Sequence, residues 1–435
     1  MSDETSQLFW LQYGEAIKDT AGVGSDKMFF LSSEAQKGPL AGSYIPKEYT
    51  AAGLYAIANS NLSTDNVFYT PSARHGYDRA LDTFLNWVDL GGNGNPGLEA
   101  ALLNAIAEQK NYQAALDSET DRAEAKWAKD FKREMTDKPF ANWLQMGRAP
   151  ACTAAKQAVD NVSQQIIQIQ LQSGGPLGNA VKTDRDNLGR GRNTDLDFPG
   201  YNMKAASGAN LNNAELLNKE RSGESIPDPL TFRVPLYNSP ECETFVKDAL
   251  TEAASGDYSS AQRTEVGIDA DKDTSDYNFG QPEGASINAG TPWFSFGDSA
   301  LDTGSEDSEV EVVVTYNDIR AVTIQPGNWK IDLSKYKLRS DAPEEVKTLS
   351  RASQAIVVAG LGFEITVGVS TAETLDSELE ETTNAGGTIS VFGITINLGD
   401  AEHNTHTTSW DKESRTFKVV PDFDNNVTTV VGVVA

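Results

Sequence analysis

The spacing of hydrophobic residues changes partway along the chain. Up to about Arg192, apolar residues recur at helical intervals in segments rich in Ala and Gln. From about Glu309 to Ala435 they alternate with polar residues, as in β-strands, and between these parts lies a stretch rich in Gly, Asn, Asp and Ser. Helices followed by strands favour an α+β fold over a βαβ enzyme core.

The helical part predicts two long helices, at about 97–131 and about 151–172, with a connector between Pro139 and Pro150. Such helices pack as an antiparallel αα-hairpin, and Gly174-Gly175-Pro176 is expected to end the second one. Their apolar stripes are narrow and coiled-coil-like. The stripe residues are Leu98, Leu102, Ile106, Tyr112, Leu116, Ala123, Trp127 and Phe131 on the first helix, and Ala155, Ala158, Val162, Ile166 and Ile169 on the second.

Shorter elements are expected around this hairpin. A short apolar helix at 9–13 should dock on a later segment, and further helices are expected at 46–60, after Pro71 and at 213–220. The rest of the stretch from about 193 to 304 has little pattern beyond a segment at 230–236. It predicts irregular structure with partial disorder near 269–276 and 303–308.

Alternation in the last part predicts five or six strands joined by short turns, including Val310–Tyr316, Ile319–Ile324 and Phe363–Val369. The phase of the alternation changes at Phe392-Gly393, which predicts a β-bulge there. The last segment, Val427–Ala435, is uncharged and apolar on both faces. It is expected in the centre of a sheet or paired with another copy.

These patterns predict an α+β protein with three regions. Residues 1–192 are expected to form a helical domain with the long antiparallel αα-hairpin. Residues 193–285 are expected to be an irregular connecting region, and residues 286–435 an antiparallel β-sandwich-like domain. A chain of 435 residues is long enough for two or three such units.

The chain is strongly acidic: 63 Asp and Glu residues against 36 Lys and Arg residues give a formal net charge of −27. Nucleic-acid binding needs clustered basic side chains, and the sequence has no such cluster, so nucleic-acid partners are not expected. The same charge disfavours adsorption to anionic membranes and favours solubility.

The cysteines and the termini indicate the compartment. Cys152 and Cys242 do not suggest a disulfide framework. The acidic start lacks the apolar stretch of a signal peptide, and the most apolar segment, Ala355–Phe363, is too short to cross a bilayer. The chain is therefore expected in the cytoplasm.

One set of short motifs is compatible with ester hydrolysis. Gly297-Asp298-Ser299 looks like the nucleophile block of GDSL esterases, Asn317-Asp318 is similar to their oxyanion Asn block, and Asp400-Ala401-Glu402-His403 fits their D-x-x-H pair. A Ser nucleophile needs a His base, which a carboxylate orients. In that family, however, the Ser block follows a strand near the start of a parallel α/β sheet, whereas here it lies in an acidic loop far along the chain. We therefore expect no catalytic residue in this set.

No metal or cofactor site is expected either. His403 and His406 form an H-x-x-H sequence that is expected in a solvent-exposed turn, and His75 is the third histidine of the chain. The carboxylates spaced as in a calcium loop are Asp269, Asp271, Asp273 and Asp276. Thr274 and Gly280 stand where the EF-hand pattern needs Gly and Glu, so only weak surface calcium binding stays open. The sequence has no Walker A or dinucleotide-binding fingerprint.

The chain resembles a group of uncharacterised proteins from filamentous fungi. The resemblance lies in Gly174–Leu177 with Thr183–Leu188, in Pro199–Lys204, and in the ending with Trp410-Asp411 before the last strands. It covers about half of the chain and implies a fungal source and a helical hairpin paired with a C-terminal β part. These motifs are not catalytic, so the resemblance implies no site residues.

The function class that these observations favour is non-enzymatic: a self-associating structural or storage protein of the cytoplasm, present as a homo-oligomer. This rests on acidic solubility, the lack of a catalytic set in context, the Gln-rich hairpin and the uncharged last strand. The first alternative is a membrane-active or pore-forming protein whose helices rearrange beside a β-rich recognition part, which the narrow stripes and the net charge disfavour. The second alternative is a GDSL-like esterase.

Overall fold

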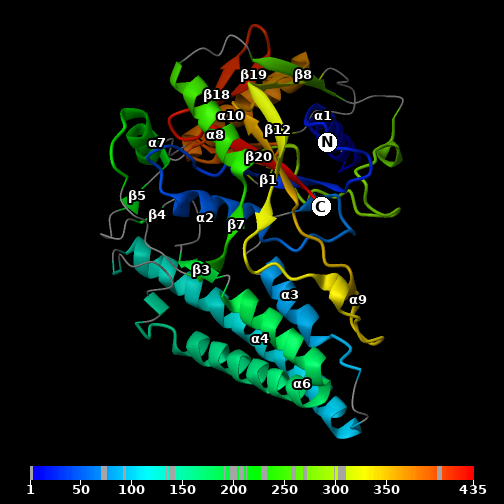
Figure 1. Cartoon of the computed structure of the whole chain (residues 1–435). Coiled ribbons are helices and arrows are strands. Elements are labelled where there is room, and N and C mark those ends of the chain that lie inside the picture. Colours follow the sequence, from blue (N-terminus) through cyan, green and yellow to red (C-terminus); the bar gives the residue numbers. More distant parts are fainter. Residues whose placement is uncertain are drawn as a thin grey trace.

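The computed structural model has a β-rich part, drawn in the upper half of Figure 1, and a helical part below it. The fold class is α+β, as the hydrophobic pattern predicts. The structure describes residues 3–69, 76–91, 95–133, 135–136, 143–144, 146–190, 192–195, 203–204, 210–211, 213–226, 233–255, 261–267, 272–297, 299–301, 310–398 and 404–435.

The last strand of the chain lies in the centre of a five-stranded sheet. The strand order is β12 (Asp318–Thr323), β14 (Gln354–Ala359), β20 (Thr428–Val434), β1 (Phe29–Lys37) and β2 (Phe68–Tyr69). β20 pairs with β14 on one side and with β1 on the other, and all 7 of its residues are buried. The prediction of a central strand is therefore confirmed. An uncharged strand with two apolar faces is stable only when both faces are covered.

A second five-stranded sheet is continuous with the first through bent strands. Its order is β18 (His406–Asp411), β19 (Thr416–Pro421), β15 (Gly362–Thr366), β11 (Glu311–Tyr316) and β8 (Gln262–Val266). β11 leads directly into β12, and β14 into β15, so a paired ribbon passes from one sheet to the other. At the bend, Gly360 has a φ of 63°, and a Cβ there would lie 2.5 Å from the Asn317 side-chain oxygen. The bend therefore requires glycine at this position.

A smaller four-stranded sheet has the order β10 (Ser299–Ala300), β9 (Phe294–Phe296), β16 (Thr388–Val391) and β17 (Ile394–Asn397). The prediction of a bulge at Phe392-Gly393 is wrong, because these two residues form the turn of the β16–β17 hairpin and Val391 pairs with Ile394. Their φ values of 44° and 77° suit a two-residue hairpin turn of a primed type. Cross-strand partners share a face, so the turn itself shifts the phase of the alternation.

Helix α1 (Asp3–Thr20) packs into the core of the β part. Phe9 stacks on Trp293 with ring centroids 4.5 Å apart, and Tyr13 stacks on Phe392 at 4.4 Å. Stacked and edge-on aromatic pairs stabilise a core beyond the area they bury. The apolar N-terminal helix thus docks on segments from the last third of the chain, as predicted.

Helices α4 (Pro96–Lys132) and α6 (Pro150–Arg190) form the predicted hairpin. Among the described residues, its contact surface consists of two separate apolar clusters. One cluster buries Leu102, Ala105, Ile106, Val162, Ile166 and Ile169, and the other, near the connector, buries Ala123, Trp143 and Cys152. Tyr112, which the spacing places in the seam, is 42% exposed and belongs to neither cluster.

The sequence Gly174-Gly175-Pro176 interrupts the second long helix at the predicted position. Gly175 takes φ 48° and ψ −126°, and a further helical segment begins at the proline, whose missing N–H is tolerated in a first turn. The result is a kink. Beyond it, the Arg185 guanidinium donates to Asp82 at 2.6 Å and to Asn86 at 2.9 Å, both on α3 (Tyr77–Asn86).

Two regions contain helices that the sequence pattern did not predict. The supposedly irregular region 193–285 holds the predicted α7 (Asn213–Ser222), but also α8 (Pro240–Ser255), which packs on β12 and β14. The supposed β domain contains α10 (Val369–Ala385). The segment 303–308 lies outside the described residues. Shorter elements are α2 (Lys47–Ala58), α9 (Glu344–Lys347), β3 (Arg192–Asp195), β4 (Met203–Lys204), β5 (Asn210–Leu211), β6 (Arg233–Pro235), β7 (Tyr237–Asn238), β13 (Gln325–Pro326), η1 (Thr274–Asp276) and η2 (Leu333–Lys335).

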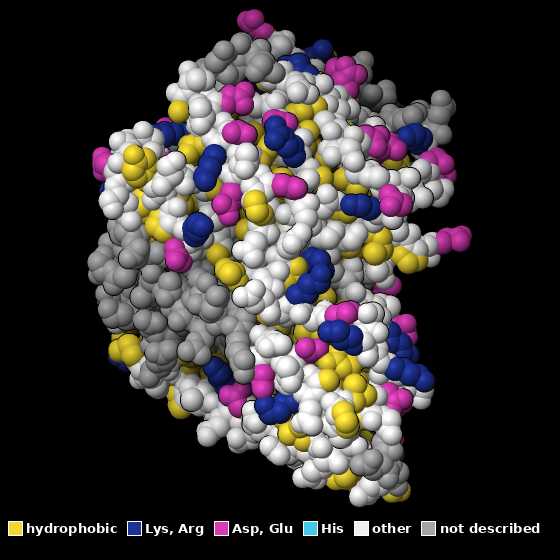
Figure 2. All heavy atoms as spheres, in the orientation of Figure 1, with side chains coloured by type: hydrophobic (Ala, Val, Ile, Leu, Met, Phe, Trp, Pro, Cys, Tyr) yellow, Lys and Arg dark blue, Asp and Glu magenta, His cyan; other side chains and the backbone are white. Residues whose placement is uncertain are grey.

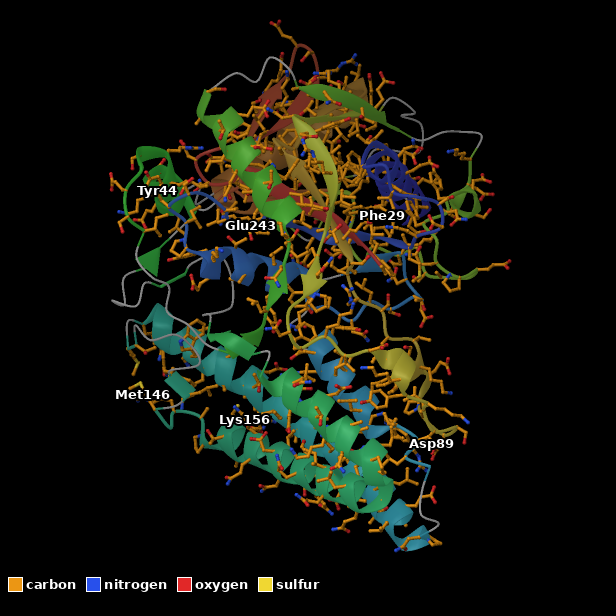
Figure 3. The ribbon with its side chains drawn as sticks, viewed as in Figure 1. Phe29, Tyr44, Asp89, Met146, Lys156 and Glu243 are labelled. Carbon is orange, nitrogen blue, oxygen red and sulfur yellow. The ribbon has the colours of Figure 1, made fainter. Side chains whose placement is uncertain are left out.

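The hydrophobic cores join distant parts of the chain. Phe9 and Leu31 share one cluster with Trp293 and Val434, and a second cluster joins α3 and α8 to the other face of the main sheet. A boundary at residue 192 therefore does not separate the cores, because periodicity does not show which segments pack together. In Figure 3, Phe29 lies in the β part, whereas Asp89 and Met146 lie toward opposite ends of the hairpin.

Candidate functional site

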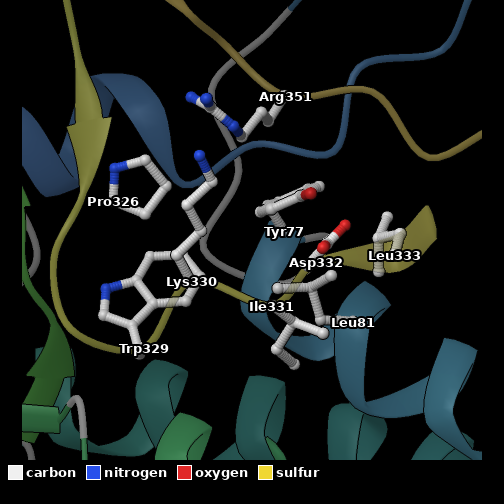
Figure 4. A pocket seen from close by; sticks show the side chains of 9 residues that line it. All are labelled: Tyr77, Leu81, Pro326, Trp329, Lys330, Ile331, Asp332, Leu333 and Arg351. Carbon is white, nitrogen blue, oxygen red and sulfur yellow. The ribbon is translucent and has the colours of Figure 1, made fainter. Parts of the chain in front are cut away.

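A pocket of ≈ 360 Å³ lies between the start of α3, the loop after β13 and the segment before β14. Figure 4 shows its lining: Tyr77 and Leu81 from α3, Pro326 from the end of β13, Trp329, Lys330, Ile331, Asp332 and Leu333 from the segment after it, and Arg351. Small-molecule sites commonly measure about 300–1,000 Å³ and combine an apolar lining with a few placed polar groups. This pocket has that composition and is the candidate site.

The apolar floor of the pocket is held in place by Trp329, which is fully buried. Its indole N–H donates to the Leu236 carbonyl at 2.7 Å, and the Gly327 N–H donates to the same carbonyl at 2.8 Å. The ring lies edge-on to Tyr237, with centroids 5.2 Å apart, and 6.4 Å from the ring of Tyr77. The segment after Pro326 thus leads into an ordered aromatic surface.

Two cationic side chains border this floor. In Figure 4 the charged ends of Lys330 and Arg351 lie on the same side of the pocket. Lys330 is exposed, and the half-buried Arg351 guanidinium donates to the carbonyls of Ile324 at 3.3 Å and Ala352 at 3.0 Å. Within the described part of the chain, neither cation forms an ion pair with a carboxylate.

Asp332 also lines the pocket, but its carboxylate is engaged by its own loop. It accepts the backbone N–H of Ser334 at 3.2 Å and the hydroxyl of the same residue at 2.6 Å, and so caps η2. These hydrogen bonds, together with the charges of Lys335 and Lys330, hold the pKa of Asp332 below its usual range. Asp332 is therefore ionised, and the lining carries two cations and one carboxylate that is bonded to Ser334.

Buried polar groups support the wall that α3 provides. The Asn59 side chain donates to the Asp78 carboxylate at 2.9 Å, and its oxygen accepts the Tyr237 hydroxyl at 3.0 Å and the Asp78 backbone N–H at 3.3 Å. Burial raises the pKa of Tyr77, with the charge of Arg351 opposing that rise, and burial raises the pKa of Tyr237 well above its ordinary value. Both phenols are therefore neutral, and these bonds cap α3 where it enters the pocket.

A second group of buried polar side chains lies near the bend between the two large sheets. His406 is 1% exposed; its Nε2–H donates to the Leu361 carbonyl at 3.0 Å, and its Nδ1 accepts the Thr405 hydroxyl at 2.7 Å. The prediction of a solvent-exposed turn is wrong for this residue, because it opens β18 on the inward face. Burial lowers the pKa of His406 to about 4, with Asp422 opposing and Lys37 adding to the shift, and burial lowers the pKa of Lys37 to about 8.

We expect the folded state to lose stability as the pH falls from 6.5 toward 4. The folded pKa of His406 lies below its ordinary value of 6.5, so the unfolded chain takes up the proton first. The contribution is full above pH 6.5 and is lost as the pH falls through about 4, by up to roughly 3 kcal/mol. Urea unfolding across this window should give a shallower pH dependence for His406→Gln than for the wild type. The carboxylates titrate alike in both proteins, so an equal pH dependence of the free energy of unfolding would show that His406 does not contribute to it.

The residues of the esterase-like set lie in different parts of the fold. Ser299 is exposed on β10 of the small sheet, whereas Asn317 lies at the bend between the large sheets and donates to Glu252 on α8 at 3.3 Å. Asp298 and the segment 400–403 lie outside the described residues. The described strand pairs of the two sheets around these residues, from β8 to β19, are antiparallel, unlike the parallel sheet of GDSL esterases. The described structure therefore gives the esterase reading no support.

The carboxylates of the calcium-like spacing are used within their own turn. Asp273 accepts the Ser275 N–H at 2.7 Å, and Asp276 accepts the Asp273 N–H at 2.9 Å, which forms a capping box on η1. Residues 75, 269, 271 and 403 lie outside the described part. Among the residues that are described, no three His, Cys, Asp or Glu side chains are grouped as metal ligands.

None of the residues that line the pocket stood out as a site in the sequence. The signal that was present is the Trp329-Lys330 pair, which one residue separates from Pro326-Gly327. Tyr77 and Arg351 lie far from this pair along the chain, and only the tertiary fold brings them to it.

On the face shown in Figure 2, Lys and Arg side chains are interspersed with Asp and Glu. Of the helices in the described ranges, none is both long and apolar enough to cross a bilayer. Comparison of the chain with protein-family models, with curated proteins and with solved structures found no match. The resemblance to the fungal group therefore stays a prediction.

Proposed function

We propose that this protein binds a small organic anion in the pocket beside Trp329, without catalysing a reaction on it. The supporting observation is the placement of two cations, Lys330 and Arg351, on one side of a buried aromatic floor with no carboxylate paired to either in the described structure. Two unpaired like charges at one pocket repel each other, and an anion between them removes that repulsion. With Asp332 included, the lining has one more positive than negative charge, in a chain of net charge −27.

The lining indicates the chemical class of the ligand. A planar apolar group would pack against Tyr77 and the other apolar lining residues beside the buried Trp329, and a carboxylate would reach the guanidinium of Arg351, whose fork matches carboxylate geometry. The volume of ≈ 360 Å³ restricts the ligand to a small molecule. Among the described residues, the lining includes no Ser, Cys or His, which favours binding over nucleophilic catalysis.

We expect aromatic monocarboxylates to bind more tightly than their neutral amides. Lys330 is exposed, so Lys330→Gln should leave the melting temperature unchanged while it weakens carboxylate binding by about tenfold, the effect of losing one charge-assisted contact. Isothermal titration calorimetry of a carboxylate panel and the matched amides measures this difference.

The matched control is Lys335→Gln, which removes the same charge from the same loop at an exposed position outside the lining. It should bind as the wild type does. If no carboxylate binds, or if Lys330→Gln and Lys335→Gln weaken binding equally, the pocket is not an anion site.

Self-association as a structural or storage protein of the cytoplasm remains a second proposal. Pairing through the last strand no longer supports it, because β20 already has a neighbour on each side. What supports it is the edge strand β8, whose charge pattern matches a second copy of itself. A pore-forming role has less support, since the apolar stripes of α4 and α6 contact each other.

A further inference from the structure

Strand β8 forms one edge of the second large sheet. Within the described residues it is hydrogen-bonded to β11 on one side, and Figure 1 shows it at the upper margin of the β part. Gln262, Arg263 and Glu265 are exposed, whereas Val266 is buried in the core. Alternate N–H and C=O groups of such an edge point away from the sheet and can pair with another strand.

The sequence of β8 is complementary to itself in one antiparallel register. When two copies pair about Thr264, Arg263 of each copy lies directly opposite Glu265 of the other, and both pairs lie on the solvent face. Opposite charges at directly opposed positions stabilise a strand pair by about 0.2–1 kcal/mol each. A shift of the centre to Arg263 would oppose two arginines, and a shift to Glu265 would oppose two glutamates, so charge selects the register about Thr264.

Charged side chains on the neighbouring strands β15 and β19 continue this row of alternating charges. Arg263 already forms an ion pair with Glu364 on β15, and Glu364 also lies 3.4 Å from the Lys418 ammonium on β19. Glu265 stands opposite Val313 and has no ion-pair partner among the described residues. A second copy would supply its cation and extend the row of alternating charges across both sheets.

We infer that two copies of this chain associate through β8, paired antiparallel about Thr264 to give one continuous sheet. The contact is two-fold symmetric, so it closes at the dimer. Pairing of β8 with β18 at the opposite edge of the sheet would instead build an open chain of copies. The inference uses no residue of the pocket and stands or falls independently of anion binding.

Sedimentation equilibrium of the full chain at near-physiological ionic strength tests the dimer, since repulsion between the two acidic copies is then screened beyond about 8 Å. The wild type should sediment at twice 46.9 kDa. Glu265→Lys places a lysine opposite Arg263 and should reduce the mass to that of the monomer, and Arg263→Glu should do the same. A mixture of the two variants restores both opposite-charge pairs and should recover a dimer with one copy of each.

The control is Glu345→Lys, an equal charge change at an exposed position on α9, which should leave the dimer intact. Circular dichroism of each variant establishes that it is folded, and recovery in the mixture excludes misfolding as the cause of dissociation. A monomeric wild type, an open series of polymers, or a mixture that stays monomeric would each overturn the inference.

Discussion

A chain that lacks Val427–Ala435 is expected to be insoluble and to lose cooperative melting. The deletion removes β20 from between β14 and β1, so two strands lose their hydrogen-bonded neighbour at once. It also removes side chains from both large hydrophobic clusters, because Val431 and Val434 face one and Val430 and Val433 face the other. Solubility and far-ultraviolet circular dichroism of the truncated chain measure the effect.

A single substitution in the same strand gives a graded version of this test. Val433 is 0% exposed, so Val433→Lys places an ammonium in the core without a partner. The expected cost is several kcal/mol, which is a large part of the free energy of unfolding of a typical domain. Val420→Lys is the matched control on β19, where the side chain is 46% exposed, and it should change stability by less than about 0.5 kcal/mol. Similar melting temperatures for the two variants, or a truncated chain that melts like the wild type, would show that β20 is not a core strand.

The sequence predicts those elements whose own pattern determines their environment. β20 could be placed in a sheet centre because an uncharged strand with two apolar faces has no other stable position. The hairpin followed from two long helical stripes and a short connector. The interruption at Gly175 followed from the Gly-Gly-Pro sequence, but the helical segment after it could not be predicted, because it depends on what that segment packs against.

The elements that the sequence did not predict either lack a clear hydrophobic period or lie in segments whose overall composition is typical of loops. β1 is buried on both faces at its start, yet it carries Ser32 and Ser33 there, so neither alternation nor a continuous apolar run appears. α10 buries only Thr371 and Leu375 and is otherwise polar. α8 did carry a signal, a proline in its first turn followed by an apolar stripe, but the loop-like composition around it obscured that pattern.

The candidate site could be predicted less well than the fold. Its lining comes from three separate parts of the chain, at 77–81, 326–333 and 351. The turn before Trp329 is predictable from Pro-Gly, but the convergence of Lys330 and Arg351 results from pairing of β12 with β14 and from the docking of α3. The histidine and aspartate motifs that the sequence does display are short matches, and where the structure describes them they serve caps and strand packing.

Phe392→Ala is expected to destabilise the protein by about 3–5 kcal/mol. The ring is 1% exposed, stacks on Tyr13 with centroids 4.4 Å apart, and lies 5.3 Å from the rings of both Trp10 and Trp293. Its loss would leave a cavity at the point where α1 meets the β part. Urea unfolding monitored by circular dichroism measures the change in the free energy of unfolding.

Phe392→Gly should be less destabilising than Phe392→Ala, by about 1 kcal/mol. The backbone at this position has a φ of 44°, which glycine adopts without strain and alanine does not. This order is the reverse of the usual one, in which glycine is the more destabilising residue.

Arg415→Gly is the matched control: it relieves a φ of 55° in the β18–β19 turn without removing a buried ring, so it should leave stability unchanged or raise it by up to about 1 kcal/mol. If the loss of stability in both Phe392 variants were smaller than the gain of stability in Arg415→Gly, the ring of Phe392 would not anchor α1. If glycine proved worse than alanine, the turn would not have the left-handed geometry that places the ring in the core.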